Sequence, residues 1–160
     1  MGSAELPVWP GRQLAFRGKT NQITEKIIGA AIRVHRSLGP GLLESAYEAC
    51  VAFELGEAAL RVERQKPVPL VYRGIKLDCG FRADMVVEGR VVVELKCKEA
   101  LHSVDHAQLL SHMRLLNVPV GLLINFHVLL LKNGITRMVS NYKEDEAYLA
   151  ESAENGRREH

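Results

Sequence analysis

Three charged residues stand among apolar ones near the middle of the chain. The stretch GFRADMVVEGRVVVELKCKEAL, residues 80–101, contains Asp84, Glu94 and Lys96 between runs of valine and leucine. A charged group in such surroundings is costly to bury unless it has a partner or a task. Carboxylates bind hard cations, and an ammonium stabilises a developing anion, so we predict that these residues form a reaction site.

The predicted strand RVVVELKCK, residues 90–98, places two of these charges on one face. Side chains alternate between the two faces of a strand, so even-numbered and odd-numbered residues separate. The odd-numbered face is predicted to be core, with Val91, Val93, Leu95 and Cys97. The even-numbered face is predicted to be the site, with Val92, Glu94, Lys96 and Lys98.

Whether Asp84 joins this face depends on the register of the hairpin, because a slip of one residue reverses every side chain. A two-residue turn at Glu88 and Gly89 sets Asp84 opposite Val93, on the wrong face. A three-residue loop over residues 87–89, with Gly89 in the left-handed conformation of a bulge, sets Asp84 opposite Val92 and diagonal to Glu94. The second register brings the two carboxylates together.

This set of groups suits the hydrolysis of a phosphodiester. Mg²⁺ is commonly held by one or two carboxylates together with water and phosphate oxygens, so Asp84 and Glu94 are predicted ligands of Mg²⁺ or Mn²⁺. Lys96 lies about 7 Å further along the same strand face. There it can orient an attacking water or neutralise the charge that develops on the phosphate.

Helical spacing of apolar residues predicts three helices. The first runs from Asn21 to the breaking sequence LGPG at residues 38–41, and the second from Leu42 to Leu55. The third runs from Val104 to Asn117, before Pro119. Residues 1–20 carry prolines, glycines and basic side chains without an apolar period, and are predicted to form an extended or flexible arm.

Strands are predicted between and after these helices. Short β-branched runs after Leu60 predict an antiparallel meander. The apolar run VPVGLLINF, residues 118–126, predicts a strand buried on both faces, and VLLLKNGITRMVS, residues 128–140, a hairpin around Asn133 and Gly134. The order predicts one α+β or mixed α/β domain over residues 21–140, followed by a charged tail at 141–160.

Composition limits the class of protein but does not choose its partner. The 160 residues carry a formal charge of +2, and no apolar run is long enough to cross a membrane, so a soluble, cytoplasmic protein is expected. The three cysteines, Cys50, Cys79 and Cys97, are odd in number and show no CxxC spacing, so they are predicted to be reduced core residues. Nucleic acid binding is neither indicated nor excluded by a pI near 8.5.

The hairpin sequence resembles the D…(D/E)xK signature of the PD-(D/E)xK nuclease superfamily. GLLESAY, residues 41–47, resembles the GxxExxY motif of one family within it, and HAQLLSHMRLLNVPVGLLINF, residues 106–126, resembles the C-terminal half of that family. The likeness spans residues 23–139. Two departures are Ala83, where a proline often precedes the aspartate, and His112, where related nucleases often carry tyrosine four residues after the glutamine.

The resemblance implies a restriction-endonuclease-like core, in which helices flank a central mixed sheet, and a metal-dependent nuclease acting on DNA. It implies that Asp84 and Glu94 hold the metal and that Lys96 is the catalytic lysine. It adds Glu44 as an auxiliary acidic residue that would also reach the metal, and Gln108 as a helix residue that positions water or substrate. Arg82 and Lys98 are the expected contacts to the substrate.

Each residue also has a structural interpretation. The charged strand face can be a solvated surface with a weak ion pair. Glu44 can be a first-turn glutamate favoured by the helix dipole, Tyr47 a core-edge aromatic with a bonded hydroxyl, and Gln108 a surface amide. His102 and His106 can bind zinc from one helix face, but His112 leaves that face.

The rival function is a nuclease-fold module without efficient turnover, which binds nucleic acid or forms oligomers. The apolar content of residues 104–126 is compatible with a homodimer. A titration with Mn²⁺ of the wild type and of Asp84→Ala would separate the enzyme from the module.

Overall fold

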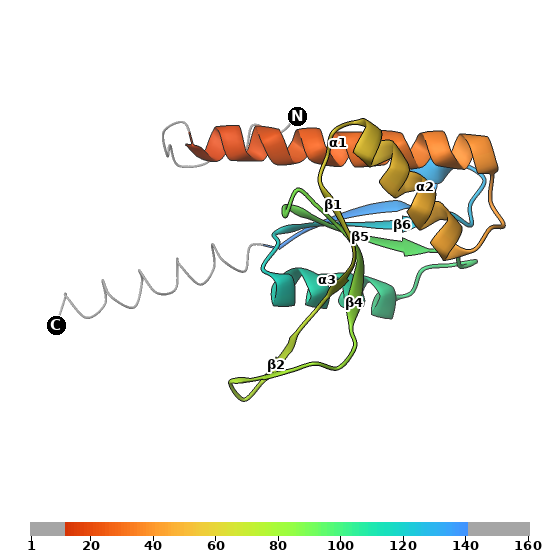
Figure 1. Ribbon diagram of the computed structural model, residues 1–160. Helices are drawn as coiled ribbons and strands as arrows, with labels where there is room; N and C mark the ends of the chain where they lie inside the picture. The colour runs from red at the N-terminus through yellow and green to blue at the C-terminus, as the bar shows by residue number, and fades with distance from the viewer. Residues whose placement is uncertain (1–11, 141–160) are drawn as a thin grey trace.

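Helices cover both faces of a central mixed sheet. A computed structural model describes residues 12–140 of the chain (Figure 1). The sheet has the strand order β1-β4-β5-β6-β7. Its strands are β1 (Val62–Pro67), β4 (Arg82–Val87), β5 (Val91–Lys96), β6 (Val120–Asn125) and β7 (Ile135–Val139). β5 and β6 are parallel and the other neighbours antiparallel, so the predicted mixed sheet is confirmed.

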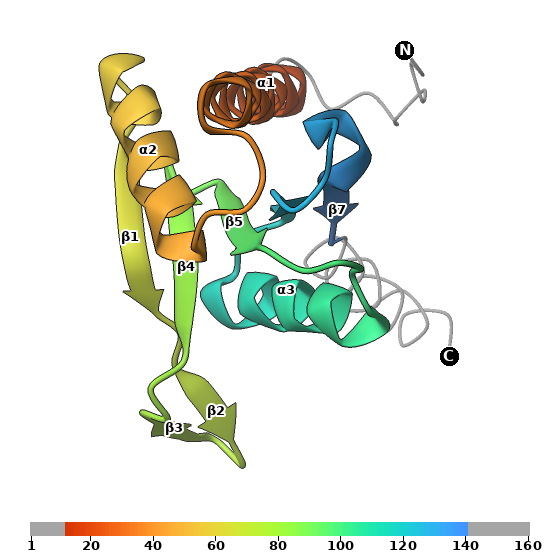
Figure 2. The ribbon, with the colours of Figure 1, turned by 90° about the vertical axis from the view of Figure 1, so that its right-hand side faces the viewer.

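Three α-helices form the outer layers. α1 (Arg12–Leu38) and α2 (Glu44–Glu57) lie on one side of the sheet, and α3 (Ser103–Leu116) lies on the other (Figure 2). The helix ends at the LGPG sequence and at Asn117 agree with the prediction, and Asn117 adopts the left-handed conformation that ends α3.

The start of α1 differs from the prediction. The helix begins at Arg12 and not at Asn21, so residues 12–20 are not an extended arm. The breaking residues Pro7, Pro10 and Gly11 all precede Arg12, and Gly18 alone costs a helix only about 1 kcal/mol. Residues 1–11 of the predicted arm and the whole predicted tail at 141–160 lie outside the described residues.

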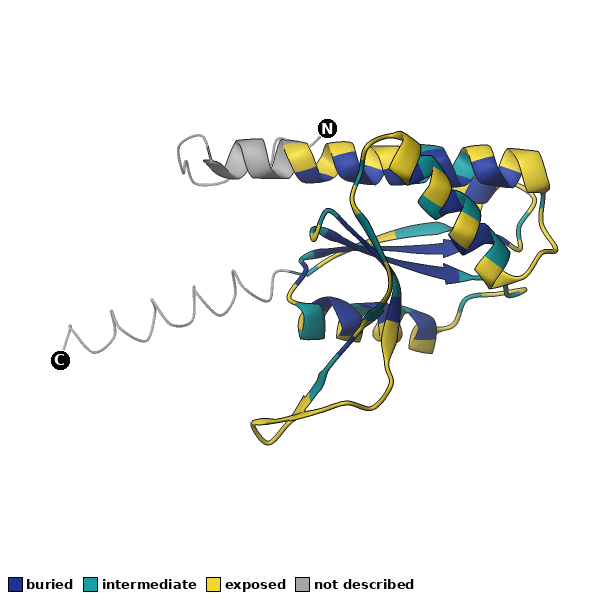
Figure 3. Ribbon diagram, viewed as in Figure 1, coloured by how far each residue is buried: buried dark blue, intermediate teal, exposed yellow. Residues whose placement is uncertain are grey.

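Two apolar clusters fill the space on either side of the sheet. The larger joins α1 and α2 to the odd-numbered face of β5, where Val91, Val93 and Leu95 are buried as predicted. The smaller joins α3 to the opposite face, through Val92. The even-numbered face, predicted to be the site, is therefore covered by α3 in the first part of β5. Figure 3 shows buried residues along the central strands, between the helical layers.

The connection from β1 to β4 is a separate hairpin. β2 (Leu70–Tyr72) pairs with β3 (Ile75–Leu77), and the turn residues Arg73 and Gly74 both have positive φ. This hairpin extends away from the main sheet, and its β3 residues are exposed (Figure 2). Cys79 follows it and is exposed, so the prediction of a buried Cys79 is wrong, whereas Cys50 and Cys97 pack against the larger cluster.

The predicted hairpin around Asn133 and Gly134 is also wrong. Residues 131–134 form a 3₁₀ helix, η1 (Leu131–Gly134), and β7 then pairs with β6. A Cβ on Gly134 would lie 2.3 Å from the carbonyl oxygen of Asn125. The absence of a side chain at Gly134 therefore allows η1 to lie close to the end of β6. The glycine does not form a turn between two strands.

The apolar residues that suggested a homodimer belong to the core of the single chain. All of β6 is buried, as predicted, and Leu109 and Met113 of α3 pack against the sheet. Val104 of α3 is exposed, and the oligomeric state stays a prediction. Among the described residues, no helix has both the length and the apolar character needed to span a membrane.

The contact between α3 and β6 depends on Gly121. A Cβ at this position would lie 2.5 Å from Sδ of Met113 and 2.9 Å from Cδ1 of Leu109. We expect Gly121→Ala to lower the free energy of unfolding by about 1–3 kcal/mol, since the buried side chains of Met113 and Leu109 must shift within a packed core. Urea denaturation measures this change. Gly29→Ala in α1 is the control, because its Cβ would make only an ordinary contact, and it should stabilise the protein by about 0.5–1 kcal/mol.

Candidate active site

The β4–β5 hairpin brings Asp84 close to Glu94, near enough to raise the pKa of Glu94. Val87 pairs with Val91 and Met85 with Val93, so Asp84 and Glu94 are the next residues beyond the paired part of the two strands. The predicted loop at residues 87–89 had set Asp84 opposite Val92, and that register is wrong. The observed loop is residues 88–90, in which Glu88 and Gly89 have positive φ and the Arg90 N–H donates to the Val87 carbonyl. Strict alternation does not hold at Asp84, because Ala83 belongs to the smaller apolar cluster and Met85 to the larger.

Asp84 is held by donors from two strands. Its Oδ2 accepts a hydrogen bond of 2.8 Å from the backbone N–H of Leu95. Its Oδ1 lies 3.4 Å from the side-chain amide nitrogen of Gln65 in β1. Gln65 has a φ of 48°, a left-handed conformation that is unfavourable for a residue with a side chain. The local backbone strain thus occurs directly opposite Asp84.

Glu94 is almost completely buried, with 2% of its surface exposed. Its Oε1 lies 2.5 Å from Nδ1 of His112 in α3. Burial raises the pKa of Glu94, the neighbouring Asp84 raises it further, and the hydrogen bond to His112 opposes both. The two predicted metal ligands are therefore close enough to interact through charge and hydrogen bonding.

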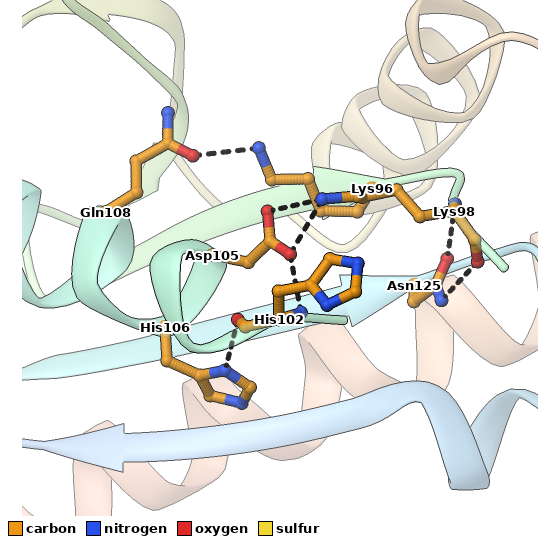
Figure 4. Close-up of polar contacts among 7 residues, drawn as sticks. All are labelled: Lys96, Lys98, His102, Asp105, His106, Gln108 and Asn125. Atoms are coloured by element: carbon orange, nitrogen blue, oxygen red, sulfur yellow. Dashed lines mark hydrogen bonds and ion pairs between the residues drawn. The ribbon is translucent and has the colours of Figure 1, made fainter. Parts of the chain in front are cut away.

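Lys96 faces Gln108, as Figure 4 shows. Its Nζ donates a hydrogen bond of 2.8 Å to Oε1 of Gln108. The predicted catalytic lysine and the predicted helix residue are thus neighbours. Gln108 is exposed on α3 but has a specific partner, so the surface-amide interpretation does not describe it fully.

Lys98 forms an ion pair with a carboxylate, unlike Lys96. Its Nζ lies 2.9 and 3.0 Å from the two carboxylate oxygens of Asp105 (Figure 4). Its backbone N–H donates to the side-chain oxygen of Asn125, whose amide donates back to the Lys98 carbonyl. Lys98 therefore anchors the end of β5 to α3 and β6, and its predicted contact with substrate would compete with the ion pair. Arg82, the other predicted substrate contact, is exposed at the start of β4.

The motif GxxExxY sets the position of α2. Gly39 and Gly41 have positive φ in the loop before the helix. The Tyr47 hydroxyl donates to the Gly39 carbonyl at 2.5 Å and accepts from the Leu42 N–H at 3.2 Å. The Tyr47 ring is fully buried and stacks on Phe126 at 4.3 Å between centroids. The structural interpretation of Tyr47 is confirmed.

Glu44 is the first residue of α2 and lies near the other charges. Burial raises its pKa most, Asp84 raises it further, and Lys96 lowers it. It lines a cavity of about 280 Å³ with Asp84 and Leu95. Glu44 therefore approaches the site from the helix, although the helix-dipole interpretation remains compatible with its place in the first turn.

Three further polar residues line this cavity but were not predicted as site residues: Ser45, Glu48 and Gln65. Glu48 is buried and accepts hydrogen bonds from Arg64 at 3.0 Å and from Gln65 at 2.5 Å. The signal for Glu48 was its position four residues after Glu44, on the same helix face. No sequence signal identified Gln65, because its role depends on the distorted conformation of β1.

The described residues contain no group of three or more His, Cys, Asp and Glu side chains arranged to hold a metal ion. The zinc alternative gains no support, since Nδ1 of His106 contacts the His102 carbonyl oxygen and His112 contacts Glu94. The third predicted ligand, Glu44, thus stays a prediction. Asp84 and Glu94 nevertheless fit Mg²⁺, which commonly takes only one or two carboxylates from the protein.

A mixed sheet between helices, with an aspartate and an ExK sequence on adjoining strands, is the arrangement expected of a nuclease core. The sequence model of the PD-(D/E)XK nuclease superfamily matches residues 21–138. The chain therefore belongs to the PD-(D/E)XK nuclease superfamily. Comparison with curated proteins and with solved structures gave no match.

Asp105 should make the stability of the protein depend on pH. The His102 N–H, followed by Lys98, holds the pKa of this buried carboxyl below its ordinary value of 3.8. A lowered pKa means that its stabilisation is present above the unfolded-state value and is lost as the pH falls through the folded-state value. We expect Asp105→Asn to cost about 1–2 kcal/mol at pH 7, from loss of the ion pair and of the carboxylate's charge at the cap, and progressively less as the pH falls below the ordinary aspartate pKa of 3.8.

Urea denaturation across this pH range measures the effect. Glu99→Gln, which changes an exposed carboxylate next to Lys98, is the control and should change stability little. A cost of Asp105→Asn that stays constant from pH 7 to strong acid would contradict the assignment.

Proposed function

We propose that the protein is a metal-dependent nuclease that hydrolyses phosphodiester bonds of DNA, and that it belongs to the GxxExxY family of its superfamily. The observation that carries the proposal is the proximity of Asp84 and Glu94, with Lys96 on the strand of Glu94 and held by Gln108. The GxxExxY assignment is supported by Tyr47, whose hydroxyl fixes the loop that places Glu44 near Asp84.

Asp84 and Glu94 would hold Mg²⁺ or Mn²⁺. Their donor atoms are carboxylate oxygens, which these hard cations prefer. The pKa of Glu94 is raised partly by Asp84, so the pair repels when both are charged, and a cation would relieve that repulsion. The bound cation would supply charge to polarise the phosphate and to lower the pKa of water.

The remaining chemistry comes from residues of the chain. The Lys96 ammonium, oriented by the amide oxygen of Gln108, would stabilise the anion that develops on the phosphate. The Leu95 N–H fixes one oxygen of Asp84, which limits reorganisation when substrate binds. Glu44 would add an auxiliary carboxylate at the cavity, as the family resemblance implies.

The rival function is a nuclease-fold module that binds nucleic acid or forms oligomers without efficient turnover. A cleavage assay on duplex, single-stranded and branched DNA and on single-stranded RNA, with Mg²⁺ or Mn²⁺, tests the choice of activity and substrate. Cleavage of DNA supports the proposal, and binding without cleavage under every condition supports the module. A cytoplasmic location and a homodimer stay predictions.

Substitutions of Lys96 and Arg82 should affect different steps, the cleavage of DNA and the binding of DNA. We expect Lys96→Ala to lower the single-turnover cleavage rate about 10²–10³-fold, because one preorganised charge is removed from the developing anion. Its affinity for DNA should change little. Arg82→Ala is the matched variant on the exposed end of β4, and should weaken binding and reduce the salt slope by about one while sparing the chemical step.

Single-turnover kinetics and binding isotherms at several salt concentrations measure these effects. Should both variants act only through affinity, with cleavage at saturation unchanged, then Lys96 is an electrostatic contact and the proposed catalytic role is wrong.

A further inference from the structure

α3 contacts β5 and the segment directly after it through three consecutive polar pairs. His112 contacts Glu94, Gln108 contacts Lys96, and Asp105 contacts Lys98. The helix residues are spaced by three and four, which is about 4.5–6 Å along a helix. Glu94 and Lys96 are two residues apart in β5, which is about 6.5–7 Å along a strand, and Lys98 follows two residues after the strand ends. Each of the three residues therefore has its own partner on α3.

The pair at Glu94 is the most deeply buried of the three. The side chains of His112 and Glu94 are 7% and 3% exposed, whereas the Lys98 side chain is 37% exposed. A buried carboxylate without a donor would lose its hydration without compensation, and it would also meet the charge of Asp84. The N–H of His112 donates to Oε1 of Glu94. It comes from α3, on the opposite side of the sheet from α2 (Figure 2).

This contact also restricts the direction of the Glu94 side chain. A glutamate has three rotatable side-chain bonds and can place its carboxylate in several positions. His112 is fixed in α3 between Leu109 and Met113, both of which are buried against the sheet. Because the ring is fixed, its hydrogen bond also fixes the position of the Glu94 carboxylate relative to α3.

We propose that His112 is a positioning residue, which holds the Glu94 carboxylate beside Asp84 and thereby sets the affinity of this pair for a divalent cation. The proposal rests on the proposed function, because it assumes that the pair binds a cation. Hydrogen-bond donors behind ligands orient them, and their removal typically costs about 10–100-fold in metal affinity.

Three variants of the full chain test the role of the donor. His112→Leu fills similar space without a donor. His112→Asn keeps an amide N–H near the place of Nδ1, because both nitrogens are bonded to Cγ. His106→Asn is the matched control on the same helix, since His106 contacts only a backbone carbonyl in its own helix turn and is remote from the proposed chemistry.

Isothermal titration calorimetry with Mn²⁺, without DNA, is the measurement. We expect His112→Leu to weaken Mn²⁺ binding at least about tenfold, His112→Asn to stay within about threefold of the wild type, and His106→Asn to bind as the wild type does. Circular dichroism at the titration temperature shows which variants are folded. If His112→Leu does not fold, His112→Ala takes its place in the comparison with His112→Asn.

The results that would contradict this proposal differ from those that would contradict the proposed function. If the wild type binds Mn²⁺ and the folded His112→Leu binds equally well, His112 does not position Glu94, and the nuclease proposal stands. Equal weakening in folded His112→Leu and His112→Asn also overturns the positioning role, because the donor is then not what matters. A wild type that binds no Mn²⁺ overturns both proposals.

Discussion

Repulsion between two neighbouring carboxylates is the interaction that the site has to overcome. Asp84 and Glu94 are close enough for each other's charge to matter, and Glu94 is also buried. The chain supplies donors to both: the Leu95 N–H and Gln65 reach Asp84, and His112 reaches Glu94. These donors come from β5, β1 and α3. The acidic pair therefore requires the assembled sheet and the helix beneath it, and could not form in the isolated hairpin.

The other helical layer contributes through a different kind of contact. Tyr47 joins α2 to Phe126 at the end of β6 by ring stacking, and its hydroxyl joins the same helix to the loop before it. Because Tyr47 lies one turn after Glu44, fixing the tyrosine also fixes the start of the helix. The position of Glu44 near Asp84 thus depends on apolar packing. The charges of Glu44 and Asp84 do not affect this packing directly.

The sequence predicted the alternation along β5 better than the register of the β4–β5 hairpin. Alternation along β5 correctly separated Leu95 from Glu94, because the two-residue period of a strand does not depend on the rest of the fold. The register did depend on context: positive φ at Glu88, a residue that rarely adopts it, moved the loop to residues 88–90. The register was wrong by two residues, and Asp84 still lies close enough to Glu94 to raise its pKa.

Contacts between distant elements could not be predicted from local patterns. The sequence placed His112 where tyrosine is common but contained no sign that its ring reaches Glu94. Likewise, the role of Gln65 arises from a distorted backbone that faces Asp84 and Glu48 across the cavity. Such residues are found only when the strands and helices have been placed, because each interaction depends on the separation of elements that are not adjacent in sequence.

The two lysines show why the partner of a residue decides its function as much as its position does. Lys96 is the last residue of β5 and Lys98 lies two residues beyond it, and each has a partner on α3. The partner of Lys98 is a carboxylate, which pairs with the ammonium and holds the end of β5 against the helix. The partner of Lys96 is an amide oxygen, which orients the ammonium, and the Lys96 charge also lowers the pKa of Glu44 at the cavity. An oriented cation beside acidic residues is what a developing phosphate anion would require, and this is why we propose chemistry for Lys96 and anchoring for Lys98.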